Sequence, residues 1–228
     1  DSLVGSEMCI RDRSYSGNIG FMSDYMYRGI HQSSSSAMGG LDIEYGGFYF
    51  GTWFADLQED GWVSGSHRGF EYDVYAGYGF DLTDSISASI GYTIYRYTDK
   101  GASAFDDDYD EVNLGLGFAA SENLSFAIDY AIGENTATDQ SETDYDVLTI
   151  SADYMGIYLL VGQWGVSEDD ASKSEVDASW WEIGYSRSVG DFDLSAGFVL
   201  SEQELAQASD SGEDGDFSRF VFSMSTSF

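Results

Sequence analysis

The chain lacks proline, is almost free of cysteine and has few basic residues. None of its 228 residues is Pro, the residue that removes a hydrogen-bond donor from a β-sheet ladder. Its single cysteine, Cys9, excludes an intramolecular disulfide. Lys and Arg number 9 against 41 Asp and Glu, which gives a net charge of −32. This balance argues against a nucleic-acid partner, because phosphate is bound by Lys and Arg.

A long apolar run and a signal peptide are also missing. No stretch approaches the ~18 apolar residues of a membrane-spanning helix, which excludes a helical membrane protein but not a β-barrel. Residues 1–13 have neither the apolar centre nor the cleavage site of a signal peptide, and they resemble translated sequencing-adapter sequence. We therefore expect residues 1–13 to be a non-native or unstructured leader, with the natural start missing, and residues 14–228 to form one barrel domain.

What the chain does have is apolar residues at every second position. In the last segment, 217–228, Phe220, Phe222, Met224 and Phe228 share one side of a strand, and mostly polar residues share the other. This ending resembles the terminal strand of bacterial outer-membrane barrels, in which a final Phe helps the assembly machinery to recognise the chain. The resemblance implies that these four residues are an assembly signal. The alternative is the last strand of a soluble β-sandwich.

Twelve such strands can be counted, and short turns alternate with long polar loops. We expect the long loops at residues 29–38, 58–68, 99–108, 134–144, 168–178 and 204–216. This hairpin rhythm is typical of an up-and-down meander, and an even count puts both termini at the end with the short turns. The sequence therefore predicts an all-β fold: a twelve-stranded, antiparallel transmembrane β-barrel with short periplasmic turns and long acidic outer loops.

The positions of the aromatic residues along the strands favour a membrane barrel over a sandwich. Two girdles of aromatic residues around an aliphatic band are typical of outer-membrane barrels, whereas a sandwich core has no reason to sort aromatics by depth. The girdle near the long loops is expected to contain Tyr25, Tyr27, Trp53, Tyr72, Tyr95, Tyr97, Tyr109, Tyr145, Trp164, Trp180 and Trp181. The strand Phe48 to Leu57 is apolar on both faces, and its facing stays open.

The polar side of the strands defines a predicted lumen. Strand alternation predicts these pore-lining residues: Asp24, Arg28, Asp42, Glu44, Glu71, Asp73, Glu111, Asp129, Asp153, Glu182, Asp193 and Arg219. Ten acids against two bases make a negative interior, which concentrates cations. In the alternative, the carboxylates pair with the two Arg and with hydroxyls and close the lumen, because twelve strands lie between filled and open barrels. We also expect Arg219 to bridge to Asp24 or a neighbouring acid at the closing seam.

Two short motifs carry a resemblance to a known family. They are Ser23-Asp24-Tyr25 with Arg28-Gly29, and Gly51-Thr52-Trp53. The opening of the chain, from Ser16 onward, resembles the TorF family of proteobacterial porins. The resemblance implies an outer-membrane barrel and a porin role, and it supports the fold more than the function.

Metal and catalytic chemistry have little support in the sequence. The acidic loop clusters Asp106–Asp108, Glu168–Asp170 and Glu213–Asp216 could bind Ca²⁺ or Mg²⁺ or bridge lipopolysaccharide, but their spacing matches no EF-hand. The two histidines are His31 and His67, both expected in outer loops. His31 is close to a serine run, yet nothing in the spacing supplies an orienting group or an oxyanion site. We therefore predict no enzyme, no cofactor and no dedicated metal site, and we rank a lipid-modifying barrel third.

The sequence thus leads to one functional hypothesis and one main alternative. The hypothesis is a Gram-negative outer-membrane porin for passive, cation-preferring diffusion of small polar solutes through a narrow acidic lumen. Its partners would be outer-membrane lipid and lipopolysaccharide, the barrel assembly machinery, small polar or cationic solutes, and loop-bound divalent cations. The alternative is a plugged structural or surface-interaction barrel that uses its acidic outer loops.

Overall fold

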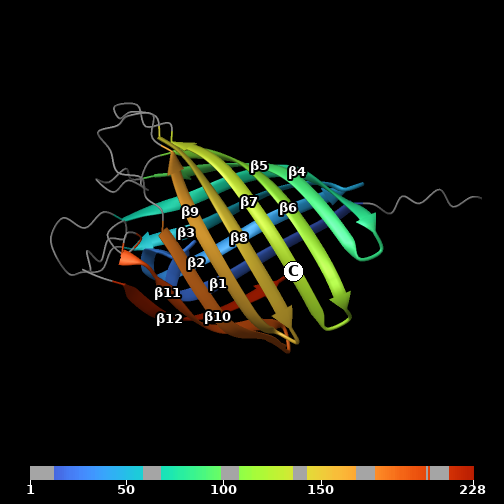
Figure 1. Cartoon of the computed structure of the whole chain (residues 1–228). Helices are drawn as coiled ribbons and strands as arrows, with labels where there is room; N and C mark the ends of the chain where they lie inside the picture. The colour runs from blue at the N-terminus through green and yellow to red at the C-terminus, as the bar shows by residue number, and fades with distance from the viewer. Residues whose placement is uncertain are drawn as a thin grey trace, which may run out of the picture.

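A computed structural model shows one closed barrel of antiparallel strands (Figure 1). The structure describes residues 13–58, 68–98, 108–135, 143–167, 178–203, 205 and 216–228. Of the expected leader at 1–13, residues 1–12 lie outside the described residues, and Arg13 is the first residue of a strand. The twelve strands are β1 (Arg13–Tyr27), β2 (Ile30–Tyr45), β3 (Phe48–Gln58), β4 (Arg68–Thr83), β5 (Ile86–Tyr97), β6 (Tyr109–Ser121), β7 (Leu124–Asn135), β8 (Thr143–Tyr154), β9 (Ile157–Ser167), β10 (Ala178–Val189), β11 (Phe192–Ser201) and β12 (Phe217–Ser227).

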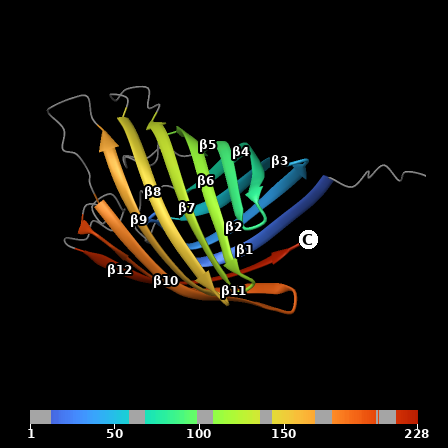
Figure 2. The same cartoon turned by 45° about the vertical axis from the view of Figure 1, so that its right-hand side comes forward.

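Each strand pairs with its neighbours in sequence, and β1 pairs with β12 to close the wall. Two-residue turns at 46–47, 84–85, 122–123, 155–156 and 190–191 gather at one end of the barrel, here called the short-turn end; the opposite end is the long-loop end. Positive φ values at Gly46 and Gly47 suit such hairpin turns. Figures 1 and 2 show the strands strongly tilted around a single wall. The predicted twelve-stranded up-and-down barrel is confirmed.

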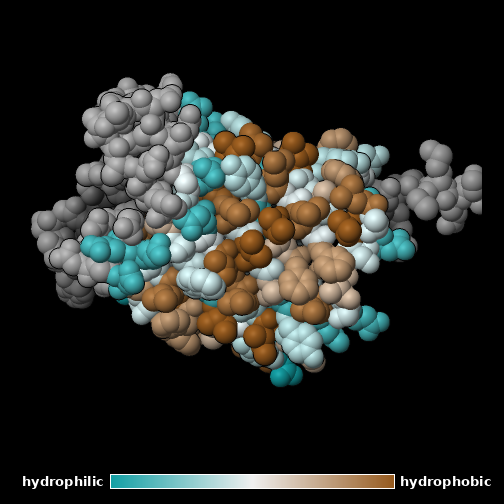
Figure 3. Space-filling model, in the orientation of Figure 1, coloured by the Kyte–Doolittle hydropathy of each residue, from teal (hydrophilic) through white to brown (hydrophobic). Residues whose placement is uncertain are grey.

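The outer surface of the barrel is apolar because strand alternation puts the large hydrophobic side chains outside. On β4, Phe70, Tyr72 and Phe80 are exposed, whereas Glu71 and Asp73 between them are buried. Figure 3 shows hydrophobic residues covering much of the visible wall. A soluble sandwich would bury these side chains between two sheets. In the described part of the chain, no helix has the length and apolarity needed to cross a bilayer.

The predicted loop at 29–38 is wrong, because this segment is strand. β1 pairs with β12 only over Asn18–Met22, and β2 pairs with β3 only from Met38 onward. Residues 24–34 therefore pair only with each other in the described register, and Ser36 and Ala37 pair with Met22 and Phe21 at their base. Together these segments form a hairpin that leaves the wall. We call residues 23–37 the inner hairpin.

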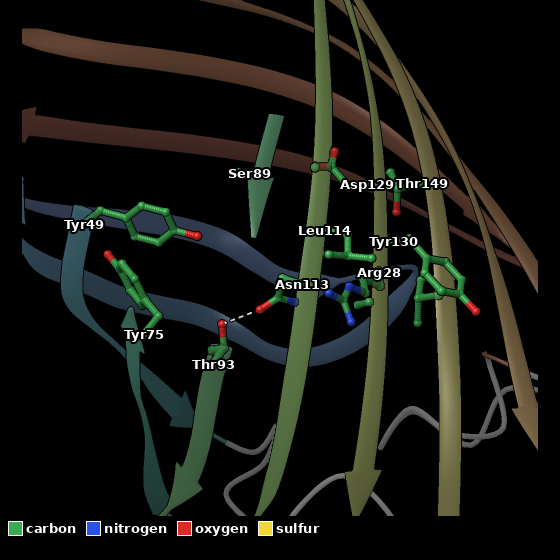
Figure 4. Close-up of a pocket in the computed structure, with 13 residues that line it drawn as sticks. Arg28, Tyr49, Tyr75, Ser89, Thr93, Asn113, Leu114, Asp129, Tyr130 and Thr149 are labelled. Atoms are coloured by element: carbon green, nitrogen blue, oxygen red, sulfur yellow. Dashed lines mark hydrogen bonds between the residues drawn. The ribbon is translucent and has the colours of Figure 1, made fainter. Parts of the chain in front are cut away.

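The tip of the inner hairpin is a two-residue turn, Arg28–Gly29, with positive φ at both positions (48° and 83°). Side chains from around the wall bond to this tip: Glu111 on β6, Trp164 on β9 and Ser201 on β11. Next to the tip, the Tyr27 hydroxyl bonds to that of Tyr95 on β5. Only a hairpin inside the lumen can meet strands so far apart in the barrel order, and Figure 4 shows it crossing the interior. Gly29 is also needed for space, because an added Cβ would meet the Trp180 side chain.

The serine run misled the sequence interpretation because part of it is enclosed inside the barrel. Ser33 and Ser36 are buried, and the hydroxyl of Ser36 donates to the backbone carbonyl of Asp56 at 2.7 Å. Small hydroxyl side chains fit inside the lumen and can bond to backbone groups. In sequence, the same residues are typical of a flexible loop.

Candidate functional site in the barrel lumen

The long-loop half of the lumen is filled by a buried aromatic cluster. Its members are Ile30, Tyr95, Tyr97, Tyr109, Ala131, Tyr145, Val147, Trp164, Ala178, Trp180, Val199 and Leu205. Six of these aromatics were expected in the girdle around the outside. They lie at the expected depth along their strands but on the inward side, so that part of the girdle prediction is wrong. On β9 the facing is reversed from the sequence pattern: Ile157 and Leu159 point outward, and Trp164 is buried inside.

An ion pair joins the inner hairpin to the wall inside this cluster. The Arg28 guanidinium donates to both carboxylate oxygens of Glu111, at 2.5 and 3.0 Å. Tyr95, Tyr145 and Asn113 donate three more hydrogen bonds to the same carboxylate, at 3.1, 2.9 and 3.0 Å. Glu111 is 0% exposed, and its charge is both matched and fully hydrogen-bonded.

Further contacts hold the hairpin tip in place. The Arg28 guanidinium lies 4.8 Å from the ring centre of Tyr27 and 5.9 Å from that of Trp164. Trp164 Nε1 donates to the backbone carbonyl of Arg28 at 2.8 Å, and the Ser201 hydroxyl donates to that of Gly29 at 2.6 Å. Both carbonyls at the tip of the turn are therefore satisfied, as burial demands.

Two other acids lie in the filled half and accept far fewer hydrogen bonds than Glu111. Glu71 and Asp73, both on β4, are 1% and 6% exposed. Tyr25 of the inner hairpin donates to Glu71 Oε1 at 3.2 Å. Glu71 Oε2 and Asp73 Oδ1 have no hydrogen-bond partner in the described part of the chain. Burying a carboxylate oxygen without a partner is costly, so this pair of acids differs physically from Glu111.

The short-turn half of the lumen is open to water. Inward-facing Glu44, Ser125, Asp129 and Asp193 are all exposed there. A cavity of about 380 Å³ lies in the middle of the barrel, with Arg28 of the hairpin tip in its lining (Figure 4). Its other polar lining residues include Tyr49, Tyr75, Ser89, Thr93, Asn113, Asp129 and Thr149. The cavity has a mixed polar and apolar lining, and Arg28 of the hairpin tip borders it.

Bonds between lining residues order the wall of this cavity. The Tyr75 hydroxyl donates to Asp42 Oδ1 at 2.5 Å, and the Thr93 hydroxyl donates to Asn113 Oδ1 at 2.8 Å. Asp129 is exposed to the lumen and has space around it. The arrangement can hold a polar solute, with one acid free to solvent and one Arg engaged by Glu111.

The twelve predicted pore-lining residues occupy inward strand positions or the inner hairpin, in three groups. In the filled half and on the inner hairpin lie Arg28, Glu71, Asp73, Glu111 and Asp24. Lower in the lumen lie Asp42, Asp129, Glu182, Glu44, Asp153 and Asp193, and on the closing strand lies Arg219. A pore-lining role for them stays a prediction. At the seam, Asp24 Oδ1 lies 3.4 Å from His31 Nε2, and Arg219 stacks on Phe217 at 5.5 Å.

The histidine chemistry weighed in the sequence does not take a catalytic form. His31 is buried in the inner hairpin, not in an outer loop. Its Nε2 lies 3.4 Å from both the Ser34 hydroxyl and Asp24 Oδ1. A triad needs the serine and the acid on different ring nitrogens, so this geometry does not match one. His67 lies outside the described residues.

The predicted loop clusters of acids also lie mostly outside the described residues. Of these acids, Asp108 is described 3.7 Å from Arg96 Nε, and Asp216 accepts from the backbone N–H of Gln203. Across the described ranges, no group of three or more His, Cys, Asp or Glu is placed to hold a metal ion.

The predicted assembly signal lies on the outward face of β12. Phe220, Phe222 and Met224 are exposed on the wall. Phe228 is 74% exposed, and its backbone makes two hydrogen bonds with Gly17 of β1, both 2.9 Å. The last residue is thus paired into the closing seam, while recognition by an assembly machine stays a prediction.

Comparisons with known proteins agree with this fold. No curated protein sequence matches the chain. The KdgM porin has a similar structure, with 10% identity, a TM-score of 0.57, and coverage of 93% of this chain and 99% of that one. The NanC porin gives 12% identity with the same TM-score and coverage. The TorF resemblance stays a prediction. The chain belongs to the family described as a bacterial protein of unknown function (Gcw_chp), whose model matches residues 12–228.

Proposed function

We propose that this protein is a porin of the Gram-negative outer membrane that passes small polar solutes, with a preference for cations, under the control of its inner hairpin. The apolar outer wall suits lipid, and the strands of 10–16 residues exceed or match the 9–11 residues that span a bilayer. In this setting the short-turn end faces the periplasm and the long-loop end faces lipopolysaccharide. The likeness to KdgM and NanC supports the barrel architecture.

The observation that carries the proposal is the cavity below the hairpin, whose lining includes the exposed Asp129. Asp129 and Asp42 line or adjoin it, and the one Arg at its end is neutralised by Glu111. A low-dielectric wall around unpaired carboxylates raises the local concentration of cations. One KdgM structure is described as a complex with oligogalacturonate, a polyanion. The acids of the present lumen favour a cationic solute instead.

The second part of the proposal is that the inner hairpin controls passage through the lumen. In the described conformation it fills the long-loop half, so passage requires the hairpin tip to move away from Glu111 and Trp164. Strand segments that pair only with each other can shift without unpairing the wall. We therefore expect a channel that is mostly closed and opens in brief steps.

The test is the reversal potential of the full chain in planar bilayers under a KCl gradient. Brief openings with a reversal potential of the cation-selective sign are expected. Openings that prefer anions would overturn the solute class. Complete absence of openings, together with no swelling of liposomes in small polar solutes, would overturn the porin proposal and favour the plugged barrel.

The plugged barrel is the second candidate, and one observation favours it. Five hydrogen bonds to Glu111 and the surrounding aromatic cluster make a well-packed closure, like the filled interior of smaller barrels. In that case the barrel would present its outer loops as an interaction surface and pass no solute.

A further inference from the structure

Glu71 and Asp73 are two buried acids at successive inward positions of β4, and among the described residues no ion pair joins either of them to a cation. Arg28 is held by Glu111, and His31 lies beside Asp24. Each of the two acids keeps one buried oxygen with no hydrogen-bond partner among the described residues. Elsewhere in the same cluster, Glu111 accepts five hydrogen bonds. A bound cation would stabilise two adjacent carboxylates whose oxygens lack hydrogen-bond partners.

Aromatic rings surround these two acids on several sides. In the strand register, Asp73 is flanked by Trp53 on β3 and Tyr95 on β5, and Glu71 is flanked by Tyr97 on β5. Directly opposed side chains of adjacent strands lie within contact distance. From above, Tyr25 of the inner hairpin donates to Glu71, and its ring centre lies 5.4 Å from that of Trp53.

We propose that Glu71 and Asp73, with the rings of Tyr25, Trp53 and Tyr95, bind the ammonium group of a small organic cation. Carboxylates supply the opposite charge, and aromatic faces attract an alkylammonium ion more specifically than they attract a hydrated metal ion. Ca²⁺ takes six to eight oxygen ligands, and the described residues show no third acid placed with these two for a metal.

The position of this site deepens the proposed function. Tyr75, which lines the cavity, follows Asp73 on the same inward face of β4, so the acids lie directly beyond the cavity wall. Tyr25 belongs to the inner hairpin that closes the route above. The inference rests on the proposed function for the direction from which the cation arrives: it would enter through the cavity and be held beneath the hairpin.

The experiment is calorimetric titration of the purified full chain in detergent with choline and with putrescine, and with K⁺ and Mg²⁺ as comparison ions. Saturable binding of an organic cation is expected, at least tenfold weaker in Asp73→Asn and in Glu71→Gln. The matched control is Asp81→Asn, an exposed acid on the same face of β4, which should bind within twofold of the wild type. The Trp53→Phe variant should bind the organic cation more tightly than the Trp53→Ala variant.

Three outcomes would overturn the site: no saturable binding of either amine, equal binding by Asp73→Asn, or binding of Mg²⁺ without binding of amines. Heat-modifiable gel migration checks that each variant forms the barrel, and Glu71→Gln and Trp53→Phe test the site independently if Asp73→Asn does not fold. Binding without conduction would retain this site and remove the porin proposal. Cation-selective conduction without amine binding would do the reverse.

Discussion

The two halves of the lumen are lined by the same strands, yet one is filled and the other is open. Inward residues in the long-loop half are large, as with Tyr95 and Tyr97 on β5. Farther down β5 they are Ser87, Ser89 and Gly91. The size of the inward residues thus changes along β5, while the outward residues from Ile86 to Ile94 stay apolar or aromatic. The comparison shows that inward side chains of the wall strands, as well as the inner hairpin, fill the long-loop half of the lumen.

The filled half also differs from the open half in how it treats charge. Glu111 is dry, paired and bonded by five donors, whereas Asp129 lies exposed in the open half and needs no protein partner. Water solvates a carboxylate in the open half, and the protein must do so in the filled half. Changes in the filled half should therefore cost more stability than equivalent changes in the open half.

The largest effect is expected from Arg28→Ala. It leaves the buried Glu111 carboxylate without its counter-ion, which should destabilise the barrel by about 3–5 kcal/mol. Denaturant unfolding in micelles, followed by gel migration, measures this. The double variant Arg28→Ala with Glu111→Gln should recover part of the loss because the uncompensated charge is gone. Losses that simply add would show that the two residues do not act as a pair.

Gly162→Ala should have the next largest effect. The indole of Trp180 lies over Gly162 in the filled half, so an added Cβ meets the ring and should cost about 1–3 kcal/mol by overpacking. The matched control is Gly79→Ala on β4, where the nearest described atom to an added Cβ is a backbone oxygen 4.0 Å away. That variant should stay within about 0.5 kcal/mol of the wild type. Equal losses at both positions would break the comparison between the halves.

The smallest effect is the difference between two tyrosine hydroxyls. Tyr145 donates to the dry Glu111, and Tyr75 donates to Asp42 beside the open cavity. Tyr145→Phe should cost about 1.5–3 kcal/mol, the range for a bond to a charged group, and Tyr75→Phe less, because water can replace its hydroxyl. Unfolding of the two variants under one condition gives the ranking, and a larger loss at Tyr75 would contradict it.

The sequence predicted the barrel because alternation is local and regular. On strands such as β4, the alternation of Phe70 and Tyr72 with Glu71 and Asp73 shows directly which side chains point outward and which point inward. Prediction from the sequence failed where the orientation of side chains depends on partners that are distant in the chain. The Ser33–Ser36 segment has the composition of a loop. The local pattern does not reveal that Ser33 and Ser36 are buried or that the hairpin tip bonds to β5, β6 and β9.

The candidate site was predictable in part for the same reason. Alternation identified Glu71, Asp73 and Glu111 as inward residues, but it could not show that Arg28 would meet Glu111 and no other acid. Tyr49 and Tyr75 of the cavity were missed because charged residues alone were taken as the lumen signal. Their inward parity on β3 and β4 would have revealed them once the facing of β3 was known.

The central claim is that the inner hairpin closes the long-loop half of the lumen together with the aromatic side chains of the wall. Removing the hairpin tests this claim most directly. Replacing residues 24–34 with Asn-Gly joins Ser23 to Ser35 next to the observed pair Met22–Ser36 and leaves the paired wall intact. Single-channel recordings of this variant should show long-lived, cation-selective openings with a conductance well above that of the wild type. A shortened barrel that assembles correctly but conducts no better than the wild type would contradict the account.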